Sequence, residues 1–211
     1  MDADVCFTAV FAIAAGSGIA MTRVDSEQNA ELIKEGKIGV IPTDTIYGIV
    51  CSALNEVTVE RLYKVRGRDA RKPCIVLISD AAELAQFGIV VDGALEKALS
   101  RVWPGAVSVI LDCPSDTFEY LHRGTKTLAF RLPKDEWLQK FLALSGPLLA
   151  PSANPEGKPP AKTLDEARRY FGETVDFYID GGECDNGAST LVRYENGRFI
   201  TLRQGHVSVK G

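Results

Sequence analysis

The sequence of 211 residues has only two histidines, His122 and His206, and neither lies in an H-x-E or a G-x-S-x-G motif. It also lacks the G-x-x-x-x-G-K-[ST] phosphate loop and the G-x-G-x-x-G dinucleotide motif. A hydrolase triad therefore has no motif to support it. Chemistry on phosphates would have to depend on cations and hydroxyls that align the reacting groups, without a nucleophile from the protein.

Cysteines are few, odd in number and scattered, and no C-x-x-C pair occurs. This pattern argues against a disulfide framework and a zinc site, and it is typical of the reducing cytosol. We therefore expect a cytoplasmic protein. Cys51 and Cys74 lie in apolar runs, so we expect both thiols in the hydrophobic core. The cysteines are Cys6, Cys51, Cys74, Cys113 and Cys184.

A membrane span is not expected at the N-terminus. The apolar run "VCFTAVFAIAAGSGIA" within residues 1–20 is too short, and contains too much glycine, to span a bilayer. The preceding "MDAD" is acidic, whereas a secretory signal begins with positive charge. Because a well-patterned region begins at Met21, we interpret residues 1–20 as an extension without an assigned role and residues 21–211 as one domain.

Negative charge slightly exceeds positive charge, with 28 Asp and Glu against 24 Lys and Arg. The formal net charge is −4, with 45% apolar and 25% charged residues, as in ordinary globular proteins. This acidity argues against a protein that coats nucleic acid, because such binding needs a broad basic face. A local site for a small anion stays open.

Helices and strands alternate along the chain, without repeats or low-complexity linkers. Asp25, Asp80 and Thr163 are expected N-caps, and Asn196-Gly197 is an expected hairpin turn. Alternation followed by a hairpin predicts one α/β (α+β) domain with a mixed parallel and antiparallel sheet. The expected helices are 25–36, 56–65, 80–88, 93–102, 134–144 and 164–171; the expected strands are 38–41, 74–78, 106–112, 127–132, 148–150, 176–180 and the two arms of 189–203.

One short stretch is strongly basic. "YKVRGRDARKP", residues 63–73, has a charge of +4, which leaves −8 for the rest of the chain. Arginine forks and lysine point charges together suit a triphosphate. The alternative is a solvated turn between a helix and a strand. The cations are Lys64, Arg66, Arg68, Arg71 and Lys72.

The stretch "TKTLAFRL" predicts a strand with two different faces. Thr125, Thr127, Ala129 and Arg131 share one face, while the leucines and the phenylalanine belong to the core. A hydroxyl, a small residue and a guanidinium on one face can hold a ligand with a carboxylate. A solvent-facing strand is the alternative.

Two further apolar strands run into polar residues. In "LLAPSANPEGKPP", Ser152 and Asn154 point the same way from the end of a buried strand, where α/β proteins usually bind ligands. In "VIPTDTIYG", the candidates are Thr43 and Thr45. A plain turn would give the same pattern in either stretch.

Together these stretches make the chain resemble the YrdC family of L-threonylcarbamoyl-AMP synthases, in its short, single-domain form. The resemblance extends over about residues 22–208 and rests on seven motifs in order: "PTDTIYG", "YKVRGR…KP", "WPG", "TLAFR", "PSANPEGKPP", "GASTLV" and "LRQG". It implies a twisted mixed sheet flanked by helices, with a concave basic cleft.

The resemblance also implies a reaction. L-threonine, bicarbonate and ATP with Mg²⁺ would give L-threonylcarbamoyl-AMP and pyrophosphate, which makes the enzyme a nucleotidyltransferase. The product would be handed to a tRNA threonylcarbamoyl transferase complex for modification of an adenosine in tRNA, with RNA contact as a further option. No membrane partner is implied.

The site residues follow from the same resemblance. Lys64 and Arg66 would be the catalytic cations, exposed at the protein surface, and Arg131 would hold the carboxylate of threonine. The loop after Lys64-x-Arg66 is longer than is common in the family, which leaves Arg71 as an alternative to Lys72. No side chain is assigned as a metal ligand. The implied ATP-binding residues are Lys64, Arg66, Lys72, Thr127, Asn154, Lys162 and Arg203, and the implied threonine-binding residues are Thr45, Arg131, Ser152 and Ser189.

Two other functions stay open. A YrdC-like paralogue could keep the ATP or carbamate site and use another acceptor. A non-catalytic RNA-binding module is the third alternative; net acidity argues against it, and salt-sensitive RNA binding without ATP would favour it.

Overall fold

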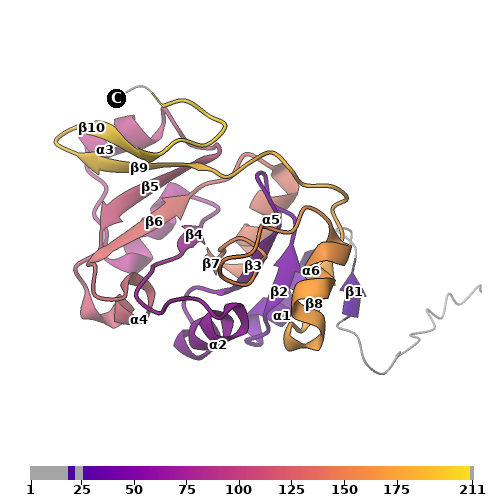
Figure 1. Cartoon of the computed structure of the whole chain (residues 1–211). Coiled ribbons are helices and arrows are strands. Elements are labelled where there is room, and N and C mark those ends of the chain that lie inside the picture. The colour runs from indigo at the N-terminus through magenta and orange to yellow at the C-terminus, as the bar shows by residue number, and fades with distance from the viewer. Residues whose placement is uncertain (1–18, 22–25, 210–211) are drawn as a thin grey trace, which may run out of the picture.

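The computed structural model describes residues 19–21 and 26–209. Its strands form one sheet in the order β1-β8-β2-β3-β7-β4-β6-β5-β9-β10 (Figure 1). Neighbouring strands are parallel in some pairs, such as β4 with β6, and antiparallel in others, such as β5 with β6. The mixed sheet predicted from sequence is confirmed.

The strands of this sheet are β1 (Ile19–Met21), β2 (Gly39–Ile41), β3 (Gly48–Ser52), β4 (Ile75–Leu77), β5 (Val107–Asp112), β6 (Thr127–Arg131), β7 (Leu148–Leu149), β8 (Phe177–Ile179), β9 (Thr190–Glu195) and β10 (Arg198–Arg203). The α-helices are α1 (Ser26–Lys34), α2 (Glu56–Arg66), α3 (Gly93–Leu99), α4 (Glu119–His122), α5 (Glu136–Ser145) and α6 (Leu164–Phe171). Short 3-10 helices are η2 (Ala81–Phe87), η3 (Asp116–Phe118) and η4 (Gly172–Thr174).

Some elements differ from the sequence prediction. Strand β3 was not predicted, because residues 42–47 reverse the chain without a two-residue turn. The segment after Asp80 is a 3-10 helix, although Asp80 caps it and Gly88 ends it as expected. Strand β1 begins in the range expected as an extension, ends at Met21 and pairs with β8. Asp25, the expected cap of α1, and residues 1–18 lie outside the described residues.

Both faces of the central sheet are buried. Along β3, Ile49 and Cys51 pack into a larger apolar cluster, whereas Val50 packs into a smaller one with α1 and α5. Burial raises the pKa of the Cys51 thiol to about 12, and Cys74 is buried as well. The prediction of core thiols is confirmed, and the buried strands give the site a rigid base.

Helix α2 delivers the basic stretch to the sheet. The Asn55 side chain accepts a hydrogen bond from the amide of Thr58 and caps the N-terminus. Gly67 ends the helix in a left-handed conformation, with φ of 57°, and its N–H bonds the carbonyl of Lys64. Residues 67–73 then run as a loop into β4.

The hairpin at the end of the chain turns as predicted. Asn196 and Gly197 both have positive φ, 51° and 77°, which is the requirement of a tight type I′ turn. The pairing register shifts between Thr201 and Arg203, so β10 is bulged close to its end. The hairpin forms one end of the molecule, with α3 beside it (Figure 1).

None of the helices in the described part of the chain has the length and apolar character needed to cross a membrane.

Candidate active site

Two adjoining pockets lie along the sheet, one of about 420 Å³ and one of about 210 Å³. They share four lining residues, Ile75, Pro151, Ser152 and Arg203, and so are compartments of one cleft. The polar side chains of the larger pocket are Arg68, Thr125, Thr127, Ser152 and Arg203. Those of the smaller pocket include Thr43, Thr45, Arg131, Ser152, Ser189 and Arg203.

Strand β6 contributes to both pockets through one face. Thr127 and Ala129 line the larger pocket, and Arg131 lines the smaller one. The alternate residues, Leu128 and Phe130, are fully buried in the core. The two-faced strand predicted from "TKTLAFRL" is confirmed, and the solvent-facing alternative is wrong.

The cleft is basic. Among the residues that the structure describes, three arginines and no carboxylate line the two pockets: Arg68, Arg131 and Arg203. The pKa of Arg131 lies below its usual value, chiefly because the guanidinium is buried; nearby Asp44 partly offsets this effect, and the charge of Arg203 adds to it. Burial also lowers the pKa of Arg203. An anionic ligand would relieve this concentration of positive charge.

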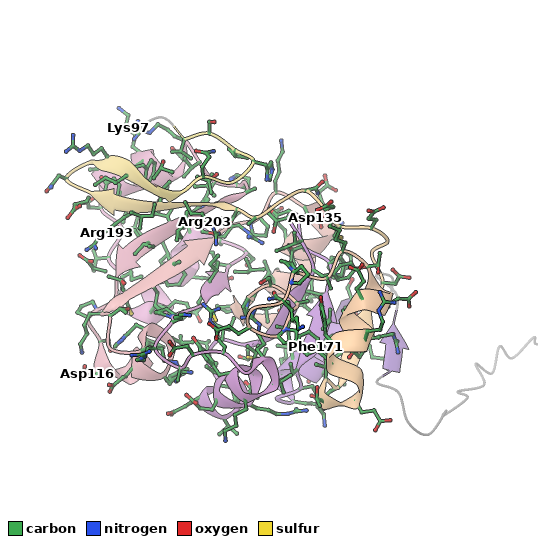
Figure 2. All side chains as sticks on the ribbon, viewed as in Figure 1. Lys97, Asp116, Asp135, Phe171, Arg193 and Arg203 are labelled. Atoms are coloured by element: carbon green, nitrogen blue, oxygen red, sulfur yellow. The ribbon has the colours of Figure 1, made fainter. Side chains whose placement is uncertain are left out.

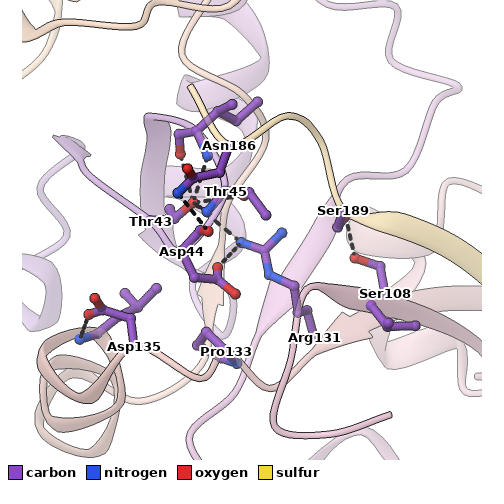
Figure 3. A network of polar contacts seen from close by, with 12 residues as sticks. Thr43, Asp44, Thr45, Ser108, Arg131, Pro133, Asp135, Asn186 and Ser189 are labelled. Carbon is purple, nitrogen blue, oxygen red and sulfur yellow. Dashed lines mark hydrogen bonds and ion pairs between the residues drawn. The ribbon is translucent and has the colours of Figure 1, made fainter. Parts of the chain in front are cut away.

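Arg131 forms a buried ion pair that sequence reasoning missed (Figure 3). Its Nη2 lies 3.0 Å from Oδ1 of Asp44, and it also donates to Thr43 Oγ1 at 3.4 Å. Thr43 and Thr45 share a hydrogen bond of 2.9 Å between their hydroxyls. The signal available in the sequence was the position of Asp44 between the two threonines of "PTDT".

The Arg131–Asp44 pair leaves polar atoms unsatisfied. Both carboxylate oxygens of Asp44 and Nε of Arg131 are buried without a hydrogen bond to any described partner. The pair is therefore close enough for attraction but lacks hydrogen-bond geometry. Because buried polar atoms are almost always satisfied in native proteins, Arg131 is poised for a further acceptor such as a ligand carboxylate.

Ser189 links the smaller pocket to the hairpin. Its hydroxyl lies 2.9 Å from that of buried Ser108, and its carbonyl accepts a hydrogen bond of 3.0 Å from Nη2 of Arg203. Arg203 is thereby held at the boundary of the two pockets. Figure 2 labels it at the inner end of β10, with Arg193 on the outer side of the hairpin.

Arg66 and Asn154, both predicted to bind ATP, contact each other. Arg66 is 2% exposed and donates through Nε to the Asn154 carbonyl at 2.9 Å and through Nη2 to Asn154 Oδ1 at 3.3 Å. The expectation that Arg66 is an exposed cation is wrong, because it lies under the Ser152–Asn154 turn. Burial lowers the pKa of Arg66, and its Nη1 is buried without a partner. Contact of either residue with ATP stays a prediction.

Three predicted ATP-binding lysines, all described, lie outside the linings of both pockets. Lys64 is exposed in the last turn of α2. Lys72 and Lys162 pair with carboxylates at 2.6 Å, Lys72 with Glu156 and Lys162 with Asp185. Their roles stay predictions. The structure brings together the other predicted residues: Thr45, Arg131, Ser152, Ser189, Thr127 and Arg203.

The Sua5/yciO/yrdC family model, described as telomere recombination, matches residues 31–205. The chain belongs to this family. The family predicted from the seven motifs is thus confirmed.

Individual relatives agree with the family assignment. The chain is 34% identical over 179 residues to the threonylcarbamoyl-AMP synthase of Pyrococcus abyssi, covering 83% of this chain and 52% of the relative. It is 31% identical over 179 residues to a putative threonylcarbamoyl-AMP synthase of Methanocaldococcus jannaschii, covering 84% of each. The solved structure of P. abyssi Sua5 complexed with L-threonine matches with a TM-score of 0.81 at 30% identity, over 89% of this chain and 57% of that one. The chain thus spans about half the length of the P. abyssi relative.

Proposed function

We propose that this chain is a nucleotidyltransferase that makes L-threonylcarbamoyl-AMP and pyrophosphate from L-threonine, bicarbonate and ATP. The observation that carries the proposal is the pair of adjoining pockets that share Ser152 and Arg203. The names of the relatives and the threonine complex of the P. abyssi protein support the same reaction.

In this proposal the smaller pocket receives threonine. The carboxylate of the bound threonine would accept hydrogen bonds from Arg131, whose Nε has no hydrogen-bond partner among the described residues. Thr45 and Ser189 line the same pocket and offer hydroxyls to the polar groups of the amino acid. Its volume of about 210 Å³ suits a small polar ligand.

The larger pocket would receive ATP, with Thr127 among the groups that line it. The amine nitrogen of threonine would bond to the carbon of bicarbonate, and one C–O bond of bicarbonate would break, so that its oxygen leaves as water with a proton from the amine. An oxygen of the resulting carbamate would then attack the α-phosphorus of ATP. An oxygen–phosphorus bond forms, the bond between the α-phosphorus and its bridging oxygen to the β-phosphorus breaks, and pyrophosphate carries away the electron pair. Because the nucleophile belongs to the substrate, the protein has only to align it with the α-phosphorus and to offset the negative charge that develops on the phosphates. Arg203, which borders both pockets, would offset part of this charge.

Magnesium would enter on the triphosphate in this scheme. The described part of the chain contains no group of three His, Cys, Asp or Glu side chains able to hold a metal ion. A Mg²⁺ ion held chiefly by phosphate oxygens fits this set of residues, and it would screen the charge of the triphosphate. Transfer of the product to a tRNA threonylcarbamoyl transferase complex, contact with RNA and a cytoplasmic location also stay predictions.

The test is the release of pyrophosphate from ATP, measured with and without L-threonine and bicarbonate, with L-serine as the control amino acid. Release that requires both co-substrates, together with detection of threonylcarbamoyl-AMP by mass spectrometry, is the expected result. Release that does not depend on threonine would contradict the proposal and favour a paralogue with another acceptor.

A further inference from the structure

We propose that Ser108 is a positioning residue that directs the hydroxyl proton of Ser189 into the smaller pocket, where Ser189 donates a hydrogen bond to an oxygen of the bound amino acid. This inference rests on the proposed function. Ser108 itself lies outside the seven sequence motifs and outside the linings of both pockets.

The position of Ser108 on strand β5 carries the first step. Its neighbours Val107 and Val109 pack into the larger apolar cluster, whereas Ile110 lines the larger pocket. Successive residues of a strand point to opposite faces, so Ser108 shares the cleft-facing side with Ile110. Ser108 is nevertheless 0% exposed. It is therefore a polar group on the cleft side that another residue covers.

The residue that contacts this buried hydroxyl is Ser189. The two hydroxyl oxygens lie 2.9 Å apart, one from β5 and the other from the residue before β9 (Figure 3). Ser189 is 2% exposed and lines the smaller pocket. Ser189 thus has Ser108 behind it and the pocket in front of it.

Burial decides which of the two hydroxyls donates. Within the part of the chain that the structure describes, Ser189 is the single hydrogen-bond partner of the Ser108 hydroxyl. If Ser189 were the donor, the proton of Ser108 would have no acceptor, and a buried donor without an acceptor is costly. We therefore assign Ser108 as the donor and Ser189 as the acceptor.

Arg203 presents a second donor to the same oxygen. Its Nη2 lies 3.0 Å from the carbonyl of Ser189 and 3.5 Å from the hydroxyl oxygen, and a guanidinium can only donate. The Ser189 oxygen therefore faces donors on two sides, which leaves its own proton for an acceptor in the pocket. The carboxylate and hydroxyl oxygens of threonine can accept this proton, whereas an ammonium group cannot.

The experiment compares initial rates of pyrophosphate release in the wild type and in Ser108→Ala, at varied L-threonine and at varied ATP. KM for threonine should rise about 3- to 10-fold, the usual effect of one neutral hydrogen bond. Both kcat and KM for ATP should change by less than about 2-fold, because the lost bond serves threonine binding alone. Calorimetric titration with L-threonine should show the same loss of affinity.

Two further substitutions separate the hydroxyl from packing. Ser108→Thr keeps the hydroxyl, and Ser108→Val has nearly the same shape as threonine without it. Both add volume at a buried site, so the difference between them reports the hydroxyl. Threonine affinity should be closer to that of the wild type in Ser108→Thr than in Ser108→Val.

Ser145→Ala is the matched control. Ser145 is also buried, and its hydroxyl donates to the carbonyl of Gly146 at 3.0 Å, but it lies outside the linings of both pockets. This variant should keep both KM values of the wild type. Circular dichroism and thermal unfolding verify that each variant is folded.

A double-mutant cycle tests whether Ser108 acts through Ser189. In the Ser189→Ala background the donor to the ligand is already absent, so adding Ser108→Ala should not raise KM for threonine further. Additive effects of the two substitutions would contradict the inference.

Other outcomes would also overturn it. An unchanged KM for threonine in folded Ser108→Ala would show that the Ser108 hydroxyl does not direct Ser189. Equal rises in KM for threonine and for ATP, or equal kinetics of Ser108→Thr and Ser108→Val, would show that Ser108 only fills space. If the wild type releases threonine-dependent pyrophosphate in these experiments, only this inference fails; a wild type without such release removes the proposed function as well.

Discussion

The guanidinium of Arg131 lies 3.0 Å from the carboxylate of Asp44, and the two side chains are only 5% and 10% exposed. The two residues come from distant parts of the sequence and meet beside the smaller pocket, where Arg131 faces the hydroxyls of Thr43 and Thr45 (Figure 3). Removing one partner of a buried ion pair leaves the other charge buried and uncompensated. Asp44 therefore positions Arg131 and stabilises its charge in the cleft.

Asp44→Asn should impair the use of threonine much more than that of ATP. We expect KM for threonine to rise about 10-fold or more because the neutral amide no longer fixes the guanidinium, while KM for ATP changes by less than about 3-fold. Initial rates of pyrophosphate release at varied threonine and at varied ATP give both constants.

Asp176→Asn is the control for this variant. Asp176 also pairs with an arginine, Arg61, at 2.6 Å, but it lies outside the linings of the two pockets. Its loss should lower stability without changing either KM. Equal effects of the two variants on threonine use would contradict a positioning role for Asp44.

Arg203→Ala should reduce the rate with little effect on folding. Arg203 borders both pockets, so its loss should lower kcat/KM for both substrates by about 10- to 100-fold. The thermal midpoint should shift little because Arg203 as a whole residue is exposed, although the protein around its guanidinium partly desolvates the charge and lowers its pKa. Arg198→Ala, at the start of the same strand, is the matched control and should retain wild-type kinetics. A normal rate in Arg203→Ala would remove the residue from the mechanism.

Arg66→Ala should destabilise the protein, whereas Lys64→Ala should not. Arg66 is buried and donates to both the carbonyl and the side chain of Asn154, so truncation should lower the free energy of unfolding by about 2–4 kcal/mol. Lys64 is exposed, and its truncation should change stability by less than about 0.5 kcal/mol. Urea unfolding followed by circular dichroism compares them. Equal midpoints for the two variants would mean that the Arg66 contacts contribute little.

Stability should depend on pH through Asp176. Burial raises the pKa of Asp176, but hydrogen bonds from Arg61 and from the amide of Ile38 outweigh it and keep the pKa below its usual value. The folded state thus binds the proton more weakly than the unfolded state, whose pKa is about 3.9. The contribution of ionised Asp176 to the free energy of unfolding is therefore complete above the pKa of the unfolded state. It is lost as the pH falls through the pKa of the folded state.

Denaturant unfolding of the wild type and of Asp176→Asn from pH 7 to pH 2 tests this dependence. The difference in unfolding free energy should be constant at neutral pH and should shrink below about pH 4. A difference that persists unchanged to pH 2 would show that the ion pair is not its source.

Local sequence determined much of this protein. The alternation of "TKTLAFRL" correctly predicted which side chains of β6 face the cleft, because successive residues of a strand point to opposite faces. Asn196-Gly197 predicted the hairpin turn, because both positions require positive φ. The order of motifs identified the family, and Ser152, Ser189 and Arg203 are indeed brought together.

Tertiary structure alone decided which cations of the basic stretch reach the cleft. Composition predicted an anion site in residues 63–73, but α2 ends at Arg66, and the loop of residues 67–73 has no fixed periodicity that tells which way each side chain points. The partners that direct Lys72 and Arg66, namely Glu156 and Asn154, come from more than eighty positions away. Asp44 shows the same limit: only folding brings it against Arg131, and long-range pairing of buried charges has no local signal in the sequence.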